Sequence, residues 1–152
     1  MNKKKVYLAG PLFSEAEQTW MRSIKEEIKE IANRKGVIVE VYWPYDDLDE
    51  KRIKSLREKA KMEIFEKCTS NLKDSDILIA LLDGPQVDDG TAWEIGYFYK
   101  NKKKETKILG VRTDFRKAGE TDASRVNAMV EVSCDKIVSS LQELKETVKD
   151  IL

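Results

Sequence analysis

The segment 83–97 holds the side chains of this sequence that are best suited to chemistry. It reads Asp-Gly-Pro-Gln-Val-Asp-Asp-Gly-Thr-Ala-Trp-Glu-Ile-Gly-Tyr. Asp88 or Asp89 can cap a helix that begins here. Gly90 allows the backbone to come close to a ligand, and Glu94 follows in about the first turn of that helix. The positive end of the helix macrodipole favours the ionised form of Glu94, which suits a nucleophile better than a proton donor.

A tyrosine near the N-terminus can complete this group. Tyr7 lies in the middle of an apolar segment, and from a strand its hydroxyl can orient a carboxylate at the end of a sheet. Two carboxyl groups with an orienting phenol can act on a glycosidic carbon through a covalent ester intermediate. Simpler interpretations stay open, because helix capping accounts for Asp88, a helix-stabilising charge accounts for Glu94, and Tyr7 suits a buried strand.

The composition narrows the chemistry to carboxylates, hydroxyls or a lysine. The chain of 152 residues contains no histidine, which excludes Ser-His-Asp and Cys-His nucleophile systems and the usual zinc ligand sets. It carries 28 basic and 28 acidic residues, so its formal net charge is zero. A balanced charge argues against a nucleic acid or an acidic membrane held by bulk electrostatics. We therefore expect a small-molecule substrate, with no metal and no other cofactor.

The cysteines and the apolar runs indicate the cellular compartment in which we expect the protein. Cys68 and Cys134 are too few and too far apart for a disulfide framework or a metal site. The opening Met-Asn-Lys-Lys-Lys leads into an apolar run that is too short for a signal peptide. No apolar run approaches the roughly 20 residues that cross a bilayer. We expect a cytoplasmic protein.

Strands and helices alternate along the sequence. Short apolar runs predict buried strands, and charged segments with apolar residues at helical spacing predict amphipathic helices. Ser14 and Glu17 fit a capping box at the start of the first helix. The expected strands are 6–10, 37–42, 76–82, 106–111 and 136–138, the expected helices are 15–34, 51–72, 91–100, 125–132 and 140–152, and the expected polar loops are 45–50 and 112–123. The second helix should bury a stripe made of Ile53, Leu56, Ala60, Ile64 and Phe65.

This alternation predicts the fold class. Strands that alternate with helices through short connections form a parallel sheet covered on both faces. No linker, repeat or low-complexity segment divides the chain. We expect one doubly wound, flavodoxin-like α/β domain over residues 1–152, with a five-stranded parallel sheet whose fifth strand is short. Ligands of such sheets bind beyond the carboxyl ends of the strands, so segments 10–13, 43–46 and 83–94 should meet there.

Three segments, taken together, match the pattern of one enzyme family. They read Lys-Val-Tyr-Leu-Ala-Gly-Pro-Leu-Phe at 5–13, Ser-Asp-Ile-Leu-Ile-Ala-Leu-Leu-Asp-Gly at 75–84, and Val-Asp-Asp-Gly-Thr-Ala-Trp-Glu-Ile-Gly-Tyr at 87–97. The D-x-G-T-x-x-E-x-G pattern in the third segment is the most specific. The sequence resembles the nucleoside 2-deoxyribosyltransferase family over almost its whole length. Arg-Val-Asn-Ala-Met at 125–129 is similar to a late motif of that family.

This resemblance implies an activity and three catalytic roles. The activity is transfer of 2-deoxyribose from one nucleobase to another, with retention at the anomeric carbon. By resemblance, Glu94 is the nucleophile that forms a deoxyribosyl ester and Tyr7 orients it. Asp88 matches a carboxylate that contacts the substrate.

The resemblance also implies how the substrates are held. Gly10 and Phe13 match a loop that flanks the sugar and the base, and Gly90 lies in the motif beside them. Asn127 matches an asparagine that binds the 5′-hydroxyl in the site of a neighbouring subunit. The implied substrates are a deoxynucleoside and a free nucleobase, and the implied assembly is a homo-oligomer whose sites are completed by a neighbour.

The sequence departs from the family at two places. Family members often carry Asp or Asn eight residues before the aspartate that opens the third strand, where it handles the base, and this sequence has Cys68 there. Either Asp46 or Asp88 then protonates the leaving base, or the base gains its proton in a different way; we include Asp46 among the substrate-binding residues. Some members use a C-terminal tyrosine carboxylate, whereas this sequence ends in Asp-Ile-Leu.

Two other functions stay open. A deoxynucleoside 5′-monophosphate N-glycosidase would use the same scaffold with water as the acceptor, and it needs donors for a phosphate. A lone Gly10 is no phosphate-binding fingerprint, although Arg112, Arg116 and Lys117 follow the fourth strand. The other alternative is a catalytically silent nucleoside-binding module. The zero net charge favours a neutral nucleoside over a nucleotide, and therefore the transferase.

Overall fold

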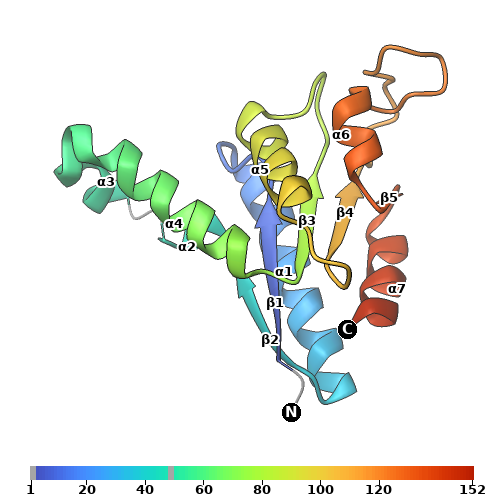
Figure 1. Ribbon diagram of the computed structural model, residues 1–152, viewed down its shortest axis with the longest axis horizontal. Coiled ribbons are helices and arrows are strands. Elements are labelled where there is room, and N and C mark those ends of the chain that lie inside the picture. The colour runs from blue at the N-terminus through green and yellow to red at the C-terminus, as the bar shows by residue number, and fades with distance from the viewer. Residues whose placement is uncertain (1–2, 48–49) are drawn as a thin grey trace.

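The centre of the molecule is a sheet of five parallel strands (Figure 1). The structure is a computed structural model that describes residues 3–47 and 50–152. The strands are β1 (Lys3–Ala9), β2 (Ile38–Tyr42), β3 (Ile77–Leu81), β4 (Lys107–Val111) and the short β5 (Lys136–Val138). Their order across the sheet is β2-β1-β3-β4-β5, which is the flavodoxin-like order. The predicted fold class is confirmed.

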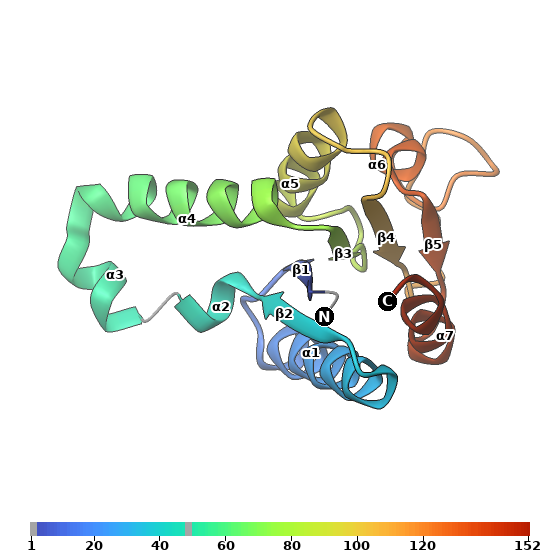
Figure 2. The ribbon, with the colours of Figure 1, turned by 60° about the horizontal axis from the view of Figure 1, so that its bottom comes forward.

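Helices cover both faces of this sheet (Figures 1 and 2). The helices α1 (Glu15–Lys35) and α7 (Leu141–Ile151) pack on one face, and α4 (Ala60–Asp74), α5 (Asp89–Lys100) and α6 (Ala128–Ser133) pack on the other. Side chains alternate along β1, so Val6 and Leu8 join the core under α1, while Tyr7 and Ala9 join the core under α5. The pleat of β1 thus places Tyr7 on the face that carries α5.

The first helix begins and ends as its sequence predicts. The Ser14 hydroxyl accepts a hydrogen bond from the Glu17 amide at 3.2 Å, and the Glu17 carboxylate accepts one from the Ser14 amide at 2.8 Å. This reciprocal pair confirms the predicted capping box. Gly36 ends the helix in the left-handed region, with a φ of 67°.

The helix predicted for residues 51–72 is interrupted, so that prediction is wrong. The chain forms α3 (Glu50–Leu56), a 3₁₀ turn η1 (Arg57–Lys59) and then α4. Arg57 has a φ of 49°, a left-handed conformation that cannot continue an α-helix. The break lets α3 fold back beside the outer part of α4, where both extend beyond the sheet (Figures 1 and 2).

The stripe predicted for this region is only partly buried. Ala60 is buried, and Ile53, Leu56 and Ile64 are half-buried. Phe65 is 52 % exposed, so its place in an inner stripe was wrong. No sheet lies beneath the outer part of α4 in Figure 2. Ala60 and Ile64 of α4 instead line a small space together with Ile53 and Leu56 of α3.

Several boundaries differ from the predicted ones, three of them by a helical turn or by three residues. The predicted loop 45–50 begins as a helical turn, α2 (Pro44–Asp47), and its residues 48–49 lie outside the described residues. The first strand begins at Lys3, because residues 3–5 pair with 38–40 of β2. The helix predicted for 125–132 begins at Ala128, because the Asn127 side chain caps it by accepting the Met129 amide at 3.0 Å. None of the described helices is long and apolar enough to span a membrane.

Candidate active site

Tyr7 and Glu94 meet at the carboxyl end of the sheet. The Tyr7 hydroxyl donates a hydrogen bond to Oε1 of Glu94 at 2.5 Å. Tyr7 is fully buried on β1, and Glu94 is half-buried in the second turn of α5, since this helix begins at Asp89. The strand β3, which leads into α5, lies beside β1 in the sheet. This adjacency brings a phenol and a carboxyl together from distant parts of the sequence.

Burial shapes the acidity of Glu94. Loss of water raises the pKa of its carboxyl to about 7; the hydrogen bond from Tyr7 opposes this shift, and the nearby Asp88 carboxylate adds to it. The expectation of a readily ionised Glu94 in the first turn is therefore wrong. The side chain lies one turn further along the helix, and desolvation outweighs the helix dipole there. Near neutral pH both protonation states are populated.

Two further side chains with neutral hydroxyl or thiol groups, Tyr42 and Cys68, lie near Tyr7. The Tyr42 ring lies 5.3 Å from the Tyr7 ring, centroid to centroid, and Cys68 of α4 packs in the same core. Burial raises the pKa of the Tyr7, Tyr42 and Cys68 side chains, and the Glu94 charge raises each of them further. All three keep their protons at neutral pH, so together they present neutral hydroxyl and thiol groups.

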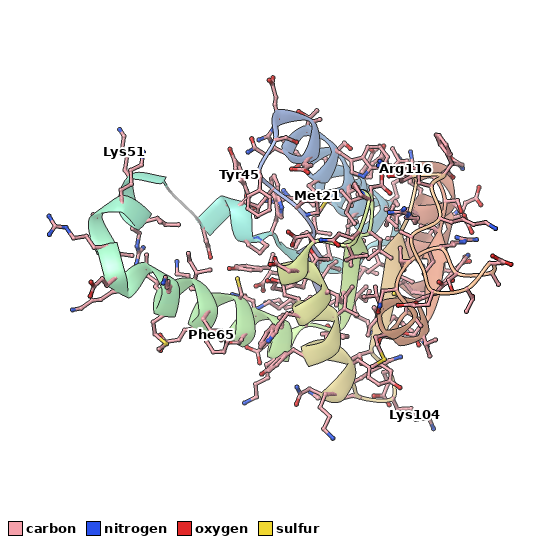
Figure 3. All side chains as sticks on the ribbon, turned by 90° about the horizontal axis from the view of Figure 1, so that it is seen from above. Met21, Tyr45, Lys51, Phe65, Lys104 and Arg116 are labelled. Atoms are coloured by element: carbon pink, nitrogen blue, oxygen red, sulfur yellow. The ribbon has the colours of Figure 1, made fainter. Side chains whose placement is uncertain are left out.

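Aromatic packing holds α4 against α5 and so brings Cys68 to this place. Trp93 stacks on Tyr97 with ring centroids 5.3 Å apart, and the Phe65 ring meets Trp93 edge-on at 5.6 Å. Figure 3 looks onto the carboxyl ends of the strands, and Phe65 there lies on the side of α4 that faces α5. Phe65 therefore contributes to helix packing although half of its surface is exposed.

Asp88 is the residue that caps α5. Its Oδ2 accepts hydrogen bonds from the Thr91 amide at 2.9 Å and from the Thr91 hydroxyl at 3.0 Å. Asp89 instead accepts the Gly90 amide at 2.7 Å. Within the described part of the chain, Oδ1 of Asp88 makes no hydrogen bond, so that oxygen is available to a ligand. Capping and substrate contact are compatible in this geometry.

The loop after β1 is set by close packing. A Cβ atom on Gly10 would lie 3.0 Å from Cβ of Leu81 and 3.2 Å from the Met21 side chain, so only glycine fits without displacement. Phe13, three residues on, is 76 % exposed, and its amide donates to the Glu17 carboxylate at 3.0 Å. The α1 capping residues thereby hold an exposed aromatic ring at the edge of the site.

The sequence from residue 6 to residue 129 matches the model of the nucleoside 2-deoxyribosyltransferase family. The chain belongs to this family. The matched range contains Tyr7, Asp88 and Glu94. No curated protein gives a significant match to the sequence.

Solved structures show the same fold as this nucleoside 2-deoxyribosyltransferase family member. A conserved protein from Enterococcus faecalis V583 is 28 % identical, with a TM-score of 0.74 over 99 % of both chains. A 2-deoxyribosyltransferase from Bacillus psychrosaccharolyticus is 20 % identical, with a TM-score of 0.67 over 95 % of both chains. A CMP N-glycosidase from Clostridium botulinum is 17 % identical, with a TM-score of 0.53 over 98 % of this chain and 100 % of that one.

Two of the predicted substrate-binding residues lie apart from Glu94. Asp46 pairs with Lys25 of α1, on the face of the sheet opposite to α5. Asn127 is exposed at the start of α6, and its amide group donates to Glu120 of the same loop. Neither residue is joined to Glu94 by a contact within the described chain. Their substrate-binding roles stay predictions.

Sequence reasoning overlooked two residues of this family member's site. Tyr42 pairs in register with Tyr7 across β1 and β2, a relationship that the two predicted strands could have suggested. Asp47 interacts with the Tyr42 hydroxyl and raises its pKa, whereas its neighbour Asp46 turns toward α1. Only the formation of α2 distinguishes these adjacent carboxylates.

The cations considered for a phosphate are occupied by the chain itself. Arg112 is 3 % exposed and donates to three backbone carbonyl oxygens. Arg116 pairs with Asp114, and the Lys117 ammonium donates to the Asp122 carbonyl at 2.6 Å. Each of these three cations therefore already has a partner within the chain.

Proposed function

We propose that this protein transfers 2-deoxyribose between nucleobases through a covalent ester on Glu94. The observation that carries the proposal is the 2.5 Å hydrogen bond from Tyr7 to Glu94, inside the sequence range that matches the family. The bond fixes one carboxylate oxygen and leaves the other to reach a sugar carbon. A positioned, partly desolvated carboxylate is suited to nucleophilic attack at an anomeric carbon.

In the first step, a carboxylate oxygen of Glu94 attacks C1′ of the deoxynucleoside while the C1′–N bond to the base breaks. The electron pair of that bond goes to the base, which gains a proton, and the sugar becomes an ester of Glu94. The transition state has oxocarbenium character, which the adjacent carboxylate stabilises. In the second step, a nitrogen of the incoming base attacks C1′, loses its proton and releases the carboxylate. Two inversions give retention.

Asp88 is our candidate to serve the leaving base, by holding it or the water molecule that supplies its proton. It lies close enough to Glu94 to raise the pKa of that carboxyl, and Oδ1 is not used in capping. Asp46 is the weaker candidate because its carboxylate pairs with Lys25 on the other face. We further propose that Gly10, Phe13 and Gly90 border the substrates.

A homo-oligomer with shared sites is part of the proposal. Asn127 is exposed, and its side chain is held by Glu120 rather than by groups around Glu94. An exposed, fixed amide suits a ligand in a neighbouring subunit better than one in its own. Residues 128–133 of α6 follow directly, so the amide lies at the start of a packed element.

The rival function is hydrolysis of a deoxynucleoside monophosphate, with water as the acceptor. The fold shared with a CMP N-glycosidase is compatible with it. Against it, the guanidinium of Arg112 binds backbone carbonyls and that of Arg116 binds Asp114. A neutral deoxynucleoside therefore fits better.

The test is to mix the purified protein with deoxyinosine and free adenine and to follow both deoxyadenosine and hypoxanthine by chromatography. Exchange supports the transferase. Hypoxanthine release without deoxyadenosine supports a hydrolase, and binding by calorimetry without either product supports a silent module. Intact-protein mass spectrometry during turnover should detect one added deoxyribosyl group, which Glu94→Gln should abolish.

A further inference from the structure

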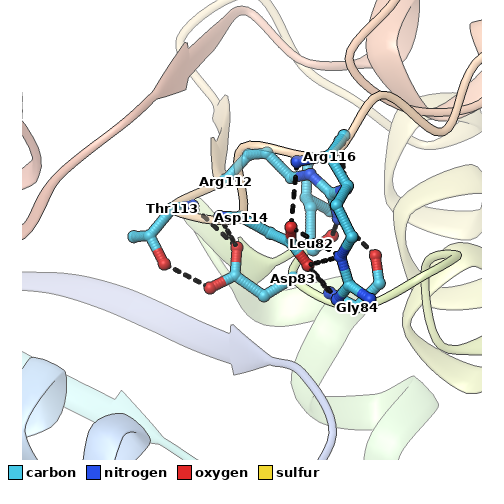
Figure 4. A network of polar contacts seen from close by, with 7 residues as sticks. All are labelled: Leu82, Asp83, Gly84, Arg112, Thr113, Asp114 and Arg116. Carbon is cyan, nitrogen blue, oxygen red and sulfur yellow. Dashed lines mark hydrogen bonds and ion pairs between the residues drawn. The ribbon is translucent and has the colours of Figure 1, made fainter.

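The loops that follow β3 and β4 are tied together by a network of buried and charged groups (Figure 4). We call this network the Arg112 clamp and define it as Arg112, Asp83 and Asp114 with the backbone groups that they bind. It lies at the same edge of the sheet as Glu94 but contains none of the residues assigned above to the reaction.

Arg112 is the centre of the clamp. Its Nη1 donates to the Leu82 carbonyl at 2.5 Å and to the Gly84 carbonyl at 2.8 Å, and its Nη2 donates to the Arg116 carbonyl at 2.7 Å. All of its side-chain hydrogen bonds among the described residues end on carbonyls and none on a carboxylate. A buried cation held in this way is costly, because backbone dipoles compensate a lost hydration shell less well than a counter-charge does.

Two carboxylates reinforce the clamp, and each accepts at least one hydrogen bond from a backbone amide of the other loop. Asp83, after β3, accepts the amides of Thr113 and Asp114 at 2.6 and 3.1 Å. Asp114, after β4, accepts the Gly84 amide at 3.2 Å. Gly84 has a φ of 118°, which a residue with a side chain rarely adopts. Both the carbonyl and the amide of this glycine are therefore fixed by the neighbouring loop.

The clamped segment leads directly into the reacting groups. Residues 82–84 connect β3 to Asp88, which caps α5, and α5 carries Glu94. Arg112 is joined to this segment through the Leu82 and Gly84 carbonyls, so any effect on α5 would be exerted through the backbone. Residues 85–87 are all that separates Gly84 from the Asp88 cap, so a displacement of Gly84 would be passed to the start of the helix that carries Glu94.

We propose that Arg112 is a positioning residue for sugar transfer, which sets the segment 82–88 and thereby the contact of Glu94 with Tyr7. The inference rests on the proposed function in that Glu94 is the nucleophile. A displacement of about 1 Å at a reacting group lowers rates by about 10²-fold, so loss of the clamp should lower kcat by about that factor and change KM much less. Glu94 should also gain water, and its pKa should fall from about 7 toward its usual range.

The test compares Arg112→Ala, Arg112→Lys and Lys117→Ala with the wild type. Lys117→Ala is the matched control, since it removes a cation of the same loop whose ammonium donates to the Asp122 carbonyl, outside the clamp. The readouts are kcat, KM and the pKa of Glu94 from carbon NMR of its carboxyl. We expect the control to match the wild type, Arg112→Ala to lose activity, and free guanidinium ion below denaturing concentrations to restore it in Arg112→Ala alone.

A folded Arg112→Ala with wild-type kcat and an unchanged Glu94 pKa would overturn the proposal. If Arg112→Ala does not fold, Arg112→Lys decides, because it keeps the charge but reaches fewer carbonyls: a wild-type kcat and pKa there also overturn it, and lowered values support it. If the wild type shows no base exchange, the proposed function fails. The NMR titration still decides the positioning role, since it needs no turnover.

Discussion

The Tyr7 hydroxyl donates to Oε1 of Glu94 at 2.5 Å and so joins two residues that lie 87 positions apart in the sequence. The hydrogen bond stabilises the carboxylate form of Glu94 and lowers its pKa against the effect of burial. Tyr7 thus performs two functions with one bond, because it fixes the direction of the carboxyl and tunes its charge.

Tyr7→Phe should raise the pH at which the enzyme becomes active. Without the hydrogen bond, the pKa of Glu94 rises above about 7, and the acidic limb of kcat/KM should move upward with it. The maximal rate should also fall by about tenfold to a hundredfold, because the carboxyl is no longer oriented. A pH–rate profile measured for base exchange checks both effects.

Asp88→Asn should move the acidic limb of kcat/KM to lower pH, opposite to the shift expected for Tyr7→Phe. It removes a negative charge that raises the pKa of Glu94, and asparagine still caps the helix. The rate at the plateau should fall, since Asp88 is proposed to serve the leaving base. If both variants moved the limb in one direction, the electrostatic account of Glu94 would be wrong.

Glu94→Gln should change how stability depends on pH. The native carboxyl pKa is raised from 4.5 to about 7, so the folded state holds the proton more tightly than the unfolded one. The stabilisation by the protonated carboxyl is present below pH 4.5 and is lost as the pH rises through about 7. The free energy of unfolding of the wild type, measured with urea, should therefore fall by up to about 3 kcal/mol over this pH window, relative to that of Glu94→Gln. If the free energy of unfolding changed with pH in the same way for both proteins, the raised pKa of Glu94 would be contradicted.

Cys68→Asp should make Glu94 harder to ionise. The thiol keeps its proton beside Tyr7, whereas an aspartate would place a second negative charge near the nucleophile. The acidic limb of kcat/KM should rise, and Cys68→Asn, which adds no charge, should leave the limb in place. An equal shift in both variants would point to packing and not to charge.

Gly10→Ala should destabilise the fold, because the new Cβ would lie 3.0 Å from Leu81 and 3.2 Å from Met21. Overpacking of this kind costs about 1–3 kcal/mol. Gly96→Ala is the matched control: it lies inside α5, its Cβ would meet nothing within 4 Å, and it should stabilise the helix by about 0.5–1 kcal/mol. Denaturant unfolding of both variants should show opposite signs, and a stable Gly10→Ala would refute the packing reason for this glycine.

Mixing Asn127→Ala with Glu94→Ala subunits should restore part of the turnover that each lacks alone, because some sites would then combine an intact Glu94 with an intact Asn127. Asn127→Ala alone should raise KM without dissociating the oligomer. Exchange of subunits is verified by mass spectrometry of differently labelled chains. A mixture that stays inactive after verified exchange would exclude a shared site.

The sequence alone determined the five strands of the parallel sheet and the two segments that bring Tyr7 and Glu94 to its edge. These depend on local patterns: apolar runs for strands, the capping box at Ser14 for α1, and the D-x-G-T-x-x-E-x-G motif that includes Glu94. Such patterns are read within a few residues, so they do not require the fold to be known.

Only the tertiary structure decided the charge state and the surroundings of these residues. The raised pKa of Glu94 arises from burial between β1 and α5, and no local pattern reports how much water remains there. The direction of Asp46 toward Lys25 depends on the helical turn α2. The binding of Arg112 to carbonyls after β3 likewise depends on the sheet order that brings β3 beside β4. Solvation and partner choice are long-range properties, because they are set by neighbours that are remote in sequence.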